Sequence, residues 1–114
     1  MRIDKFEDII AWQKAKKLTL IIYRVFKKNR DFCFKDQIQK AVISIMNNIA
    51  EGFERYGNKE LSRFLFIAKG SCAEVRSMLL VAKEISYISE KDFHEMYNLT
   101  LEISKLLSGF IKTL

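Results

Sequence analysis

A strip of polar side chains runs along an otherwise apolar stretch of the chain, and its carboxylate is a group that could do acid–base chemistry. The polar residues are separated by 7, 4, 3 and 4 positions, a spacing that places all of them on one face of a helix. They are Gln37, Ser44, Asn48, Glu51 and Arg55. A second carboxylate, Glu74, follows in the next stretch of helical pattern, and two carboxylates can act as general acid and general base.

The other parts of a catalytic site are absent from the sequence. It contains no G-x-S-x-G nucleophile motif, no glycine-rich phosphate loop and no cluster of residues at metal-ligand spacing. The one histidine, His94, is expected at the surface. Catalysis would require Glu51 and Glu74 to converge in a pocket that excludes water. We therefore predict that the protein is not an enzyme, that no residue is catalytic, and that it has no cofactor and no metal.

Polar groups between packed helices often fix how the helices register, and we favour this structural interpretation of the strip. Gly70 lies mid-helix, where glycine costs about 1 kcal/mol relative to alanine and usually indicates a close backbone approach. Ser71 and Glu74 lie beside it. The predicted polar seam comprises Gln37, Ser44, Asn48, Glu51, Arg55, Gly70, Ser71 and Glu74.

The elements that must position these residues are helices, because apolar residues recur at helical spacing throughout and no segment alternates like a strand. We predict helices over Glu7–Asn29, Lys35–Arg55, Lys59–Ser86 and Glu90–Lys112. Asn58 and Ser89 are the predicted N-caps of the third and fourth helices. Because the connections are short, each helix must run back along its predecessor. The expected fold is a single all-α domain, residues 1–114, an antiparallel up-down-up-down four-helix bundle.

Composition is compatible with such a domain. The chain has 114 residues, of which 49% are hydrophobic and 30% charged, enough to form one core without metals or disulfides. No apolar run approaches the roughly 18 residues of a membrane span, and the N-terminus lacks an export signal. We expect a soluble, cytoplasmic protein with no membrane association. Cys33 and Cys72 are expected to be reduced thiols.

The net charge of +6 is concentrated in the first half of the chain. From Lys14 to Lys35 there are eight Lys or Arg residues and one acid, Asp31, a pattern that favours contact with RNA or DNA. On a helical wheel Lys14, Lys17, Arg24 and Lys28 form a ridge interrupted by Ile21; the alternative is an ordinary solvated surface. The predicted nucleic-acid-binding residues are Lys14, Lys17, Arg24, Lys27, Lys28, Arg30 and Lys35.

Aromatic residues in the helical pattern are expected in the core. Trp12, Tyr23, Phe26 and Phe64 recur at helical spacing, and we interpret them as packing residues rather than as a platform for stacked bases.

The second predicted helix has more apolar surface than one core can use. Its apolar residues cover half the circumference or more, whereas a helix with one core face needs a stripe of about 100°. We predict an exposed patch on this helix that is buried in a homo-oligomer. Four apolar residues on the back of the third helix favour the same conclusion: Phe66, Ala73, Leu80 and Val81.

Four motifs carry a resemblance to a known family: A-W-Q-K-A at residues 11–15, Q-I-Q-K-A at 37–41, S-I-M-N-N-I-A-E-G-F-E-R at 44–55 and R-F-L-F-I-A-K-G-S at 63–71. Together they resemble the four-helix bundle proteins named for intervening sequences in 23S rRNA, the S23 ribosomal-type proteins. Members commonly have prolines between the first two helices and before the NIAEG segment. Here residues 29–34 contain no proline, and the position before the NIAEG segment where a proline is common is Met46. The absence of a proline in residues 29–34 leaves the geometry of the first connection open.

The resemblance implies a ring-like homopentamer and no established activity. It also implies a relation to the basic pentameric accessory proteins of diversity-generating retroelements, which bind a reverse transcriptase and nucleic acid. We expect a non-enzymatic oligomer that binds structured RNA or other nucleic acid through the basic face of its first helix. The alternative is a scaffold that docks a partner protein and has no direct role with nucleic acid.

Overall fold

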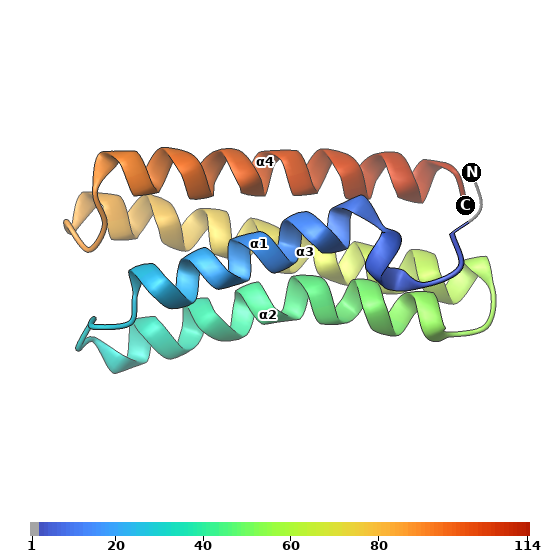
Figure 1. Ribbon diagram of the computed structural model, residues 1–114, viewed down its shortest axis with the longest axis horizontal. Coiled ribbons are helices and arrows are strands. Elements are labelled where there is room, and N and C mark those ends of the chain that lie inside the picture. Colours follow the sequence, from blue (N-terminus) through green and yellow to red (C-terminus); the bar gives the residue numbers. More distant parts are fainter. Residues whose placement is uncertain (1–2) are drawn as a thin grey trace.

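The computed structural model describes residues 3–114 and shows an all-α protein. In these residues four long helices follow a short 3-10 turn, and consecutive helices run antiparallel (Figure 1). The elements are η1 (Phe6–Asp8), α1 (Ile10–Val25), α2 (Phe32–Glu54), α3 (Asn58–Glu84) and α4 (Glu90–Lys112). The predicted antiparallel up-down-up-down four-helix bundle is confirmed. Residues 1 and 2 of the predicted domain lie outside the described residues.

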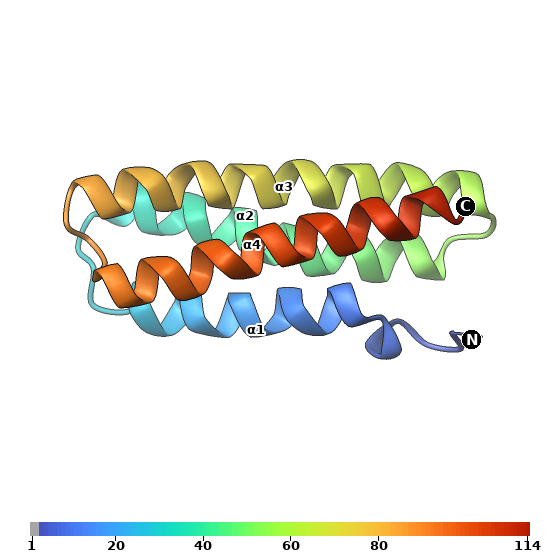
Figure 2. The same cartoon turned by 90° about the horizontal axis from the view of Figure 1, so that it is seen from above.

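The four helices form a closed ring of neighbours. Helix α1 packs on α2 and α4, and α3 packs on the same two helices. Helices α1 and α3 therefore lie on opposite sides of the bundle (Figure 2). The connections α1–α2 and α3–α4 lie at one end, at the left in Figure 1, and the α2–α3 connection lies at the other. The bundle measures 43 × 22 × 19 Å.

The predicted cap is confirmed for α4 and is wrong for α3. Helix α4 has the predicted bounds, and the Oγ of Ser89 accepts a hydrogen bond from the N–H of Asp92 at 3.1 Å. This bond satisfies one of the N–H groups that a helix leaves unpaired at its start. At the start of α3 the cap position belongs to Gly57, one residue before Asn58, and no side chain caps this end.

Helix α1 is shorter than predicted at both ends. The prediction was Glu7–Asn29, but the chain forms η1 first, and Ile9 is extended (φ −75°, ψ 121°), so α1 begins at Ile10. At the other end Phe26 leaves the helical conformation (φ −93°, ψ 4°). A turn then leads directly into α2.

Helix α2 begins earlier than predicted because Asp31 caps it. The Oδ1 of Asp31 accepts a hydrogen bond from the N–H of Phe34 at 3.1 Å, and the Asp31 N–H is bonded to the Oδ1 of Asn29 at 2.8 Å. The helix therefore starts at Phe32 rather than at Lys35. These local bonds shape the first connection without a proline.

Helix α3 ends at Glu84, two residues before its predicted end. Ser86 has a left-handed backbone conformation (φ 61°), which stops the helix. The N–H of Ser86 bonds to the carbonyl of Lys83 (3.1 Å), and the N–H of Tyr87 bonds to that of Ala82 (2.8 Å). This is the Schellman arrangement, with serine where glycine is usual.

Tyr87 joins the two connections at this end of the bundle. Its hydroxyl donates to the Oδ2 of Asp31 at 2.6 Å, and its ring meets that of Phe34 edge-on with 5.4 Å between centroids. The hydrogen bond from Tyr87 and the one from the Phe34 N–H lower the pKa of Asp31. The bond to Asp31 also raises the pKa of the Tyr87 hydroxyl.

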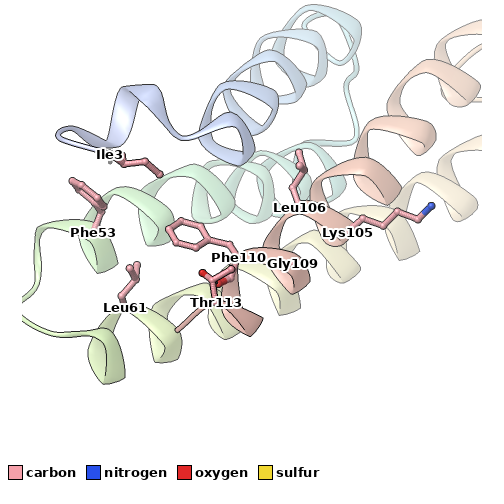
Figure 3. A pocket seen from close by; sticks show the side chains of 8 residues that line it. All are labelled: Ile3, Phe53, Leu61, Lys105, Leu106, Gly109, Phe110 and Thr113. Atoms are coloured by element: carbon pink, nitrogen blue, oxygen red, sulfur yellow. The ribbon is translucent and has the colours of Figure 1, made fainter. Parts of the chain in front are cut away.

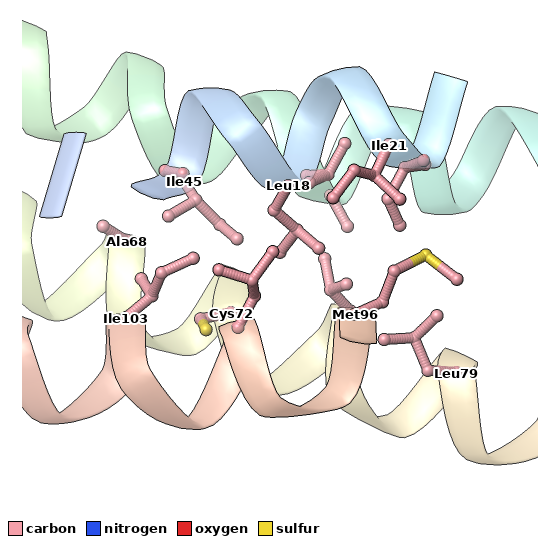
Figure 4. Close-up of a cluster of buried hydrophobic side chains, with 14 of the residues drawn as sticks. Leu18, Ile21, Ile45, Ala68, Cys72, Leu79, Met96 and Ile103 are labelled. Atoms are coloured by element: carbon pink, nitrogen blue, oxygen red, sulfur yellow. The ribbon is translucent and has the colours of Figure 1, made fainter. Parts of the chain in front are cut away.

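All four helices contribute to one apolar core (Figure 4). Leu18 of α1, Ile45 of α2, Cys72 of α3 and Ile103 of α4 are fully buried. Each such aliphatic side chain stabilises the fold by roughly 1.5–3 kcal/mol. Ile21 is buried in the same core, so it does not interrupt the basic ridge of α1. No helix within residues 3–114 is long and apolar enough to cross a membrane.

The predicted exposed apolar patch on α2 is wrong. Ile43 and Met46 are half-buried and pack against the core, because α2 has a neighbouring helix on each side. Among the described residues of α2, Phe32 in the first turn is the one large apolar side chain that is exposed. The buried core includes Ile38, Ala41, Val42, Ile45 and Ile49 of this helix, and Phe34 and Phe53 pack against it.

Candidate nucleic-acid interface

The exposed face of α1 and of the turn after it is cationic. Residues 9–30 contain seven Lys or Arg and no Asp or Glu. Five of the predicted nucleic-acid-binding residues are exposed, and within residues 3–114 none of the five forms an ion pair. We call this set the α1 cationic surface: Lys17, Arg24, Lys27, Lys28 and Arg30.

Two of the predicted binding residues do not belong to this surface. Lys14 turns toward α4, where its Nζ lies 3.4 Å from the Oε2 of Glu102. The Nζ of Lys35 donates to the backbone carbonyl of Lys27 at 2.9 Å and lies 6.0 Å from the ring centroid of Phe32. Both lysines have partners within the chain and are less available to a phosphate.

The aromatic residues predicted for the core divide into two groups. Phe26 and Phe64 are buried, and Trp12 is half-buried with its ring edge-on to that of Phe6 at 5.3 Å. Tyr23 is 40% exposed, so its assignment to the core is wrong. It is exposed on α1 and is followed in the sequence by Arg24.

The polar seam lies within one chain, between α2 and α3. The hydroxyls of Ser44 and Ser71 are 2.8 Å apart across the two helices. The Nδ2 of Asn48 donates to the Oγ of Ser44 at 2.9 Å and to its carbonyl at 2.7 Å. No buried side-chain nitrogen or oxygen lacks a partner in the described part of the chain. The seam is therefore a satisfied network that sets the register of α2 against α3.

The two carboxylates of the seam do not converge. The Oε2 of Glu74 accepts a hydrogen bond from the Nε2 of Gln37 (3.2 Å), whereas Glu51 pairs with Arg55 on its own helix (3.0 Å). Since Gln37 and Glu51 are 14 positions apart, the two pairs are separated by roughly 20 Å along α2. All four side chains are exposed. This geometry does not build an acid–base pair.

Gly70 does not mark the close approach that we predicted. A Cβ at Gly70 would have no neighbour within 4 Å. The close contact is at Gly52, where a Cβ would lie 2.6 Å from the Cβ of Phe64 and 3.3 Å from the Cδ1 of Leu61. Sequence spacing alone does not separate these two glycines, because both lie in helices and only the packing partner differs.

His94 and the cysteines have no chemical role that the geometry supports. His94 is exposed and its Nε2 lies 3.4 Å from the Oε2 of Glu90. Cys33 is exposed and Cys72 is buried, and both are free thiols. Burial raises the pKa of the Cys72 thiol to about 11. Among residues 3–114 no group of three His, Cys, Asp or Glu is placed to hold a metal ion.

An apolar cavity of about 700 Å³ opens at the end of the bundle opposite the α1–α2 connection (Figure 3). Because α1 starts late, the side chains of α2, α3 and α4 are incompletely covered there. The cavity contains neither Glu51 nor Glu74. Its walls are formed by Ile3, Phe53, Leu61, Lys105, Leu106, Gly109, Phe110 and Thr113.

Helix α3 exposes the apolar face that its sequence predicted. Phe66 is 57% exposed, Leu80 45% and Val81 48%, and Ala73 lies between them on the same side. Helices α1 and α3 lie on opposite sides of the bundle (Figure 2), so this apolar face and the α1 cationic surface belong to helices that do not contact each other. A contact made through the apolar face of α3 would leave the α1 cationic surface free.

Comparisons with known proteins place the chain in a family. A solved structure with the same fold is that of a protein with unknown function from the S23 ribosomal protein family of Bacteroides thetaiotaomicron, with 24% identity and a TM-score of 0.84. The match covers 90% of this chain and 98% of that one. No curated protein matches the chain. Residues 7–109 match the family model of the 23S rRNA-intervening sequence proteins. The chain therefore belongs to the 23S rRNA-intervening sequence protein family.

Proposed function

We propose that this protein binds structured RNA or other nucleic acid through the α1 cationic surface and catalyses no reaction. The observation that carries the proposal is the complete lack of acids in residues 9–30, next to five exposed cations without an ion pair in the described chain. Ordinary solvated helices interleave both signs of charge. A surface of one sign attracts a polyanion and raises its local concentration.

Binding would proceed through phosphate contacts. Lys and Arg side chains displace counterions from the nucleic-acid backbone, so affinity falls with salt and depends little on sequence. If three to five cations of the surface contact phosphates, raising the salt from about 50 to 200 mM should weaken binding to duplex by roughly 40- to 500-fold.

Charge reversal tests this proposal. The variant with Lys17→Glu, Arg24→Glu and Lys28→Glu should lose binding to a structured RNA at about 50 mM salt, because three phosphate contacts become repulsions. Fluorescence anisotropy with a labelled RNA hairpin measures the affinity. Absence of binding by the unmodified protein at this salt would reject the proposal.

A matched control separates local charge from net charge. Reversal of Lys59, Lys91 and Lys105, which are exposed on other parts of the bundle, brings the net charge from +6 to zero just as the α1 reversals do. The control variant should keep most of its affinity. Equal losses in the two variants would contradict a role for α1.

We further propose that the protein is a homo-oligomer, and a ring-like homopentamer in particular, as the family resemblance implies. The exposed apolar face of α3 supports a subunit contact there, because contiguous exposed apolar surface often marks an interface. Leu80→Glu should dissociate the oligomer in light scattering at micromolar concentration. Leu20→Glu, at an exposed leucine of α1, is the matched control and should leave the assembly intact. A monomeric unmodified protein would refute this part of the proposal.

The second candidate function is a protein-interaction scaffold, which the same α3 face favours. The resemblance to accessory proteins of diversity-generating retroelements supports a partner such as a reverse transcriptase. A purified complex that persists after nuclease treatment and is lost in Leu80→Glu would support the scaffold. A complex that nuclease dissolves would indicate that nucleic acid holds it together.

A further inference from the structure

Two exposed aromatic rings, those of Tyr23 and Phe32, lie at the end of the bundle where α1 turns into α2. The rings of Phe26 and Phe34 pack across this turn with 5.9 Å between centroids, which fixes how the two helices align. Tyr23 precedes Phe26 by three positions and Phe32 precedes Phe34 by two. Both exposed rings therefore belong to the same end of the α1–α2 hairpin, at the left in Figure 1.

Neither of these two rings is buried in the core. Phe32 is 61% exposed and Tyr23 40% exposed, whereas Phe26 between them in sequence is fully buried. Neither exposed ring packs against another aromatic ring in the described chain. Both rings thus keep a face open to solvent.

Cations flank the rings in the sequence, and one lies beside Phe32 in the structure. Arg24 adjoins Tyr23 in sequence, and Lys27 and Arg30 follow in the turn toward Phe32. The ammonium of Lys35 is held beside the Phe32 ring by its bond to a backbone carbonyl.

Acids are few on α1, the turn after it and the first part of α2. Residues 9–50 contain only Asp31 and Asp36. The carboxylate of Asp31 is already occupied by Tyr87 and by the N–H of Phe34. Asp36 lies one turn into α2 and is exposed. The charge that α1, the turn and the start of α2 contribute beside the two rings is therefore predominantly positive and suits a phosphate backbone.

Rings and cations recognise different parts of a nucleic acid. Cations contact phosphates in paired and unpaired strands alike. Aromatic rings stack on the faces of bases, and these faces are hidden inside a continuous duplex but available in loops, bulges and single strands. A cationic surface that also carries open rings should therefore prefer unpaired nucleotides.

From this juxtaposition we infer that Tyr23 and Phe32 stack on unpaired bases, and that the α1 cationic surface selects nucleic acid with unpaired nucleotides over continuous duplex. The inference rests on the proposed function and adds the class of nucleic acid.

Two RNAs of equal phosphate number test it: a fully paired duplex and the same duplex with an internal loop of unpaired nucleotides. The variant Tyr23→Leu with Phe32→Leu keeps apolar side chains but removes the rings. It should bind the looped RNA roughly 30-fold more weakly, because each stacked base contributes about fivefold or more to the affinity. Its affinity for the duplex should change by less than about twofold, since phosphate contacts remain. Phe66→Leu, at an exposed ring on the opposite side of the bundle, is the control and should change neither affinity.

The outcomes separate the two proposals. Tighter binding of the looped RNA that disappears in the double variant supports stacking. Equal affinity for both RNAs, or equal weakening of both in the double variant, overturns the inference and leaves the proposed function standing. Failure of the unmodified protein to bind either RNA overturns the proposed function itself. Circular dichroism of the double variant checks that its helices are retained.

Discussion

Substitution of Gly52 by alanine tests the packing of α2 against α3 directly. The added Cβ would lie 2.6 Å from the Cβ of Phe64, about an ångström closer than ordinary carbon contacts at 3.5–4.0 Å. A Cβ is attached to the backbone and cannot rotate away, so the two helices must separate locally. Overpacking of this kind costs about 1–3 kcal/mol, and the better helix propensity of alanine returns at most about 1 kcal/mol. Gly52→Ala should therefore destabilise the fold by about 1–2 kcal/mol.

Gly70→Ala is the matched control, because Gly70 also lies in a helix but its Cβ position is open. The same propensity difference acts without a clash, so this variant should be more stable than the unmodified protein by about 0.5–1 kcal/mol. Urea unfolding followed by circular dichroism measures both changes from shifts of the midpoint at constant slope. The measurements should be made at several protein concentrations, since assembly through α3 would make the midpoint concentration-dependent.

Two outcomes for these variants would contradict the packing described above. If Gly52→Ala is as stable as Gly70→Ala, the contact at Phe64 is not tight and helix propensity alone governs both sites. If Gly70→Ala is destabilised and also loses its oligomeric state, then the open face at Gly70 is covered by another subunit.

Three further outcomes are expected. Tyr87→Phe removes the hydroxyl that lowers the pKa of Asp31, so that pKa should rise in carbon-13 NMR titrations. A lowered carboxyl pKa stabilises the fold fully above its unfolded value near 3.8 and loses this effect as the pH falls through the folded-state pKa. The variant should therefore be less stable at neutral pH, and this difference should vanish at low pH. Ser44→Ala removes two hydrogen bonds of the polar seam and should cost about 1 kcal/mol in urea unfolding, a net figure that includes the better helix propensity of alanine. Thiol labelling near pH 8 should modify Cys33 rapidly and Cys72 only on unfolding, because burial raises the pKa of the latter to about 11; rapid reaction of both would contradict the burial.

The helical periodicity was sufficient to predict the fold, because the core residues of the four helices repeat at helical spacing. It also placed Ser44 and Asn48 on one strip. It could not pair Ser44 with Ser71, since that pairing depends on how far α3 slides along α2. That alignment is a tertiary feature, visible in the Ser44–Ser71 contact and in the close packing of Gly52 against Phe64.

Only part of the candidate binding site could be predicted from the sequence, for a similar reason. A helical wheel shows which side a residue is on and not which helix lies beside it. Lys14 was placed with the outward cations, but α4 provides Glu102 as its partner. Tyr23 was assigned to the core because its spacing fits, yet its side chain is exposed. Ile21 shows the reverse case, because the wheel placed it among lysines and the structure buries it in the core.

The polar seam has a consequence for how the bundle opens. Helices α2 and α3 are joined along their shared length, by Gln37 and Glu74 toward one end, by the Ser44 pair in the middle and by Gly52 toward the other. Helix α1 is the shortest helix and lies outside this pairing, so it can detach while α2 and α3 stay together. Such partial opening should make the amide protons of α1 exchange with solvent faster than those of the α2–α3 pair. A polyanion bound to α1 would oppose the detachment. Its binding should therefore slow the exchange of the amide protons of α1 with solvent.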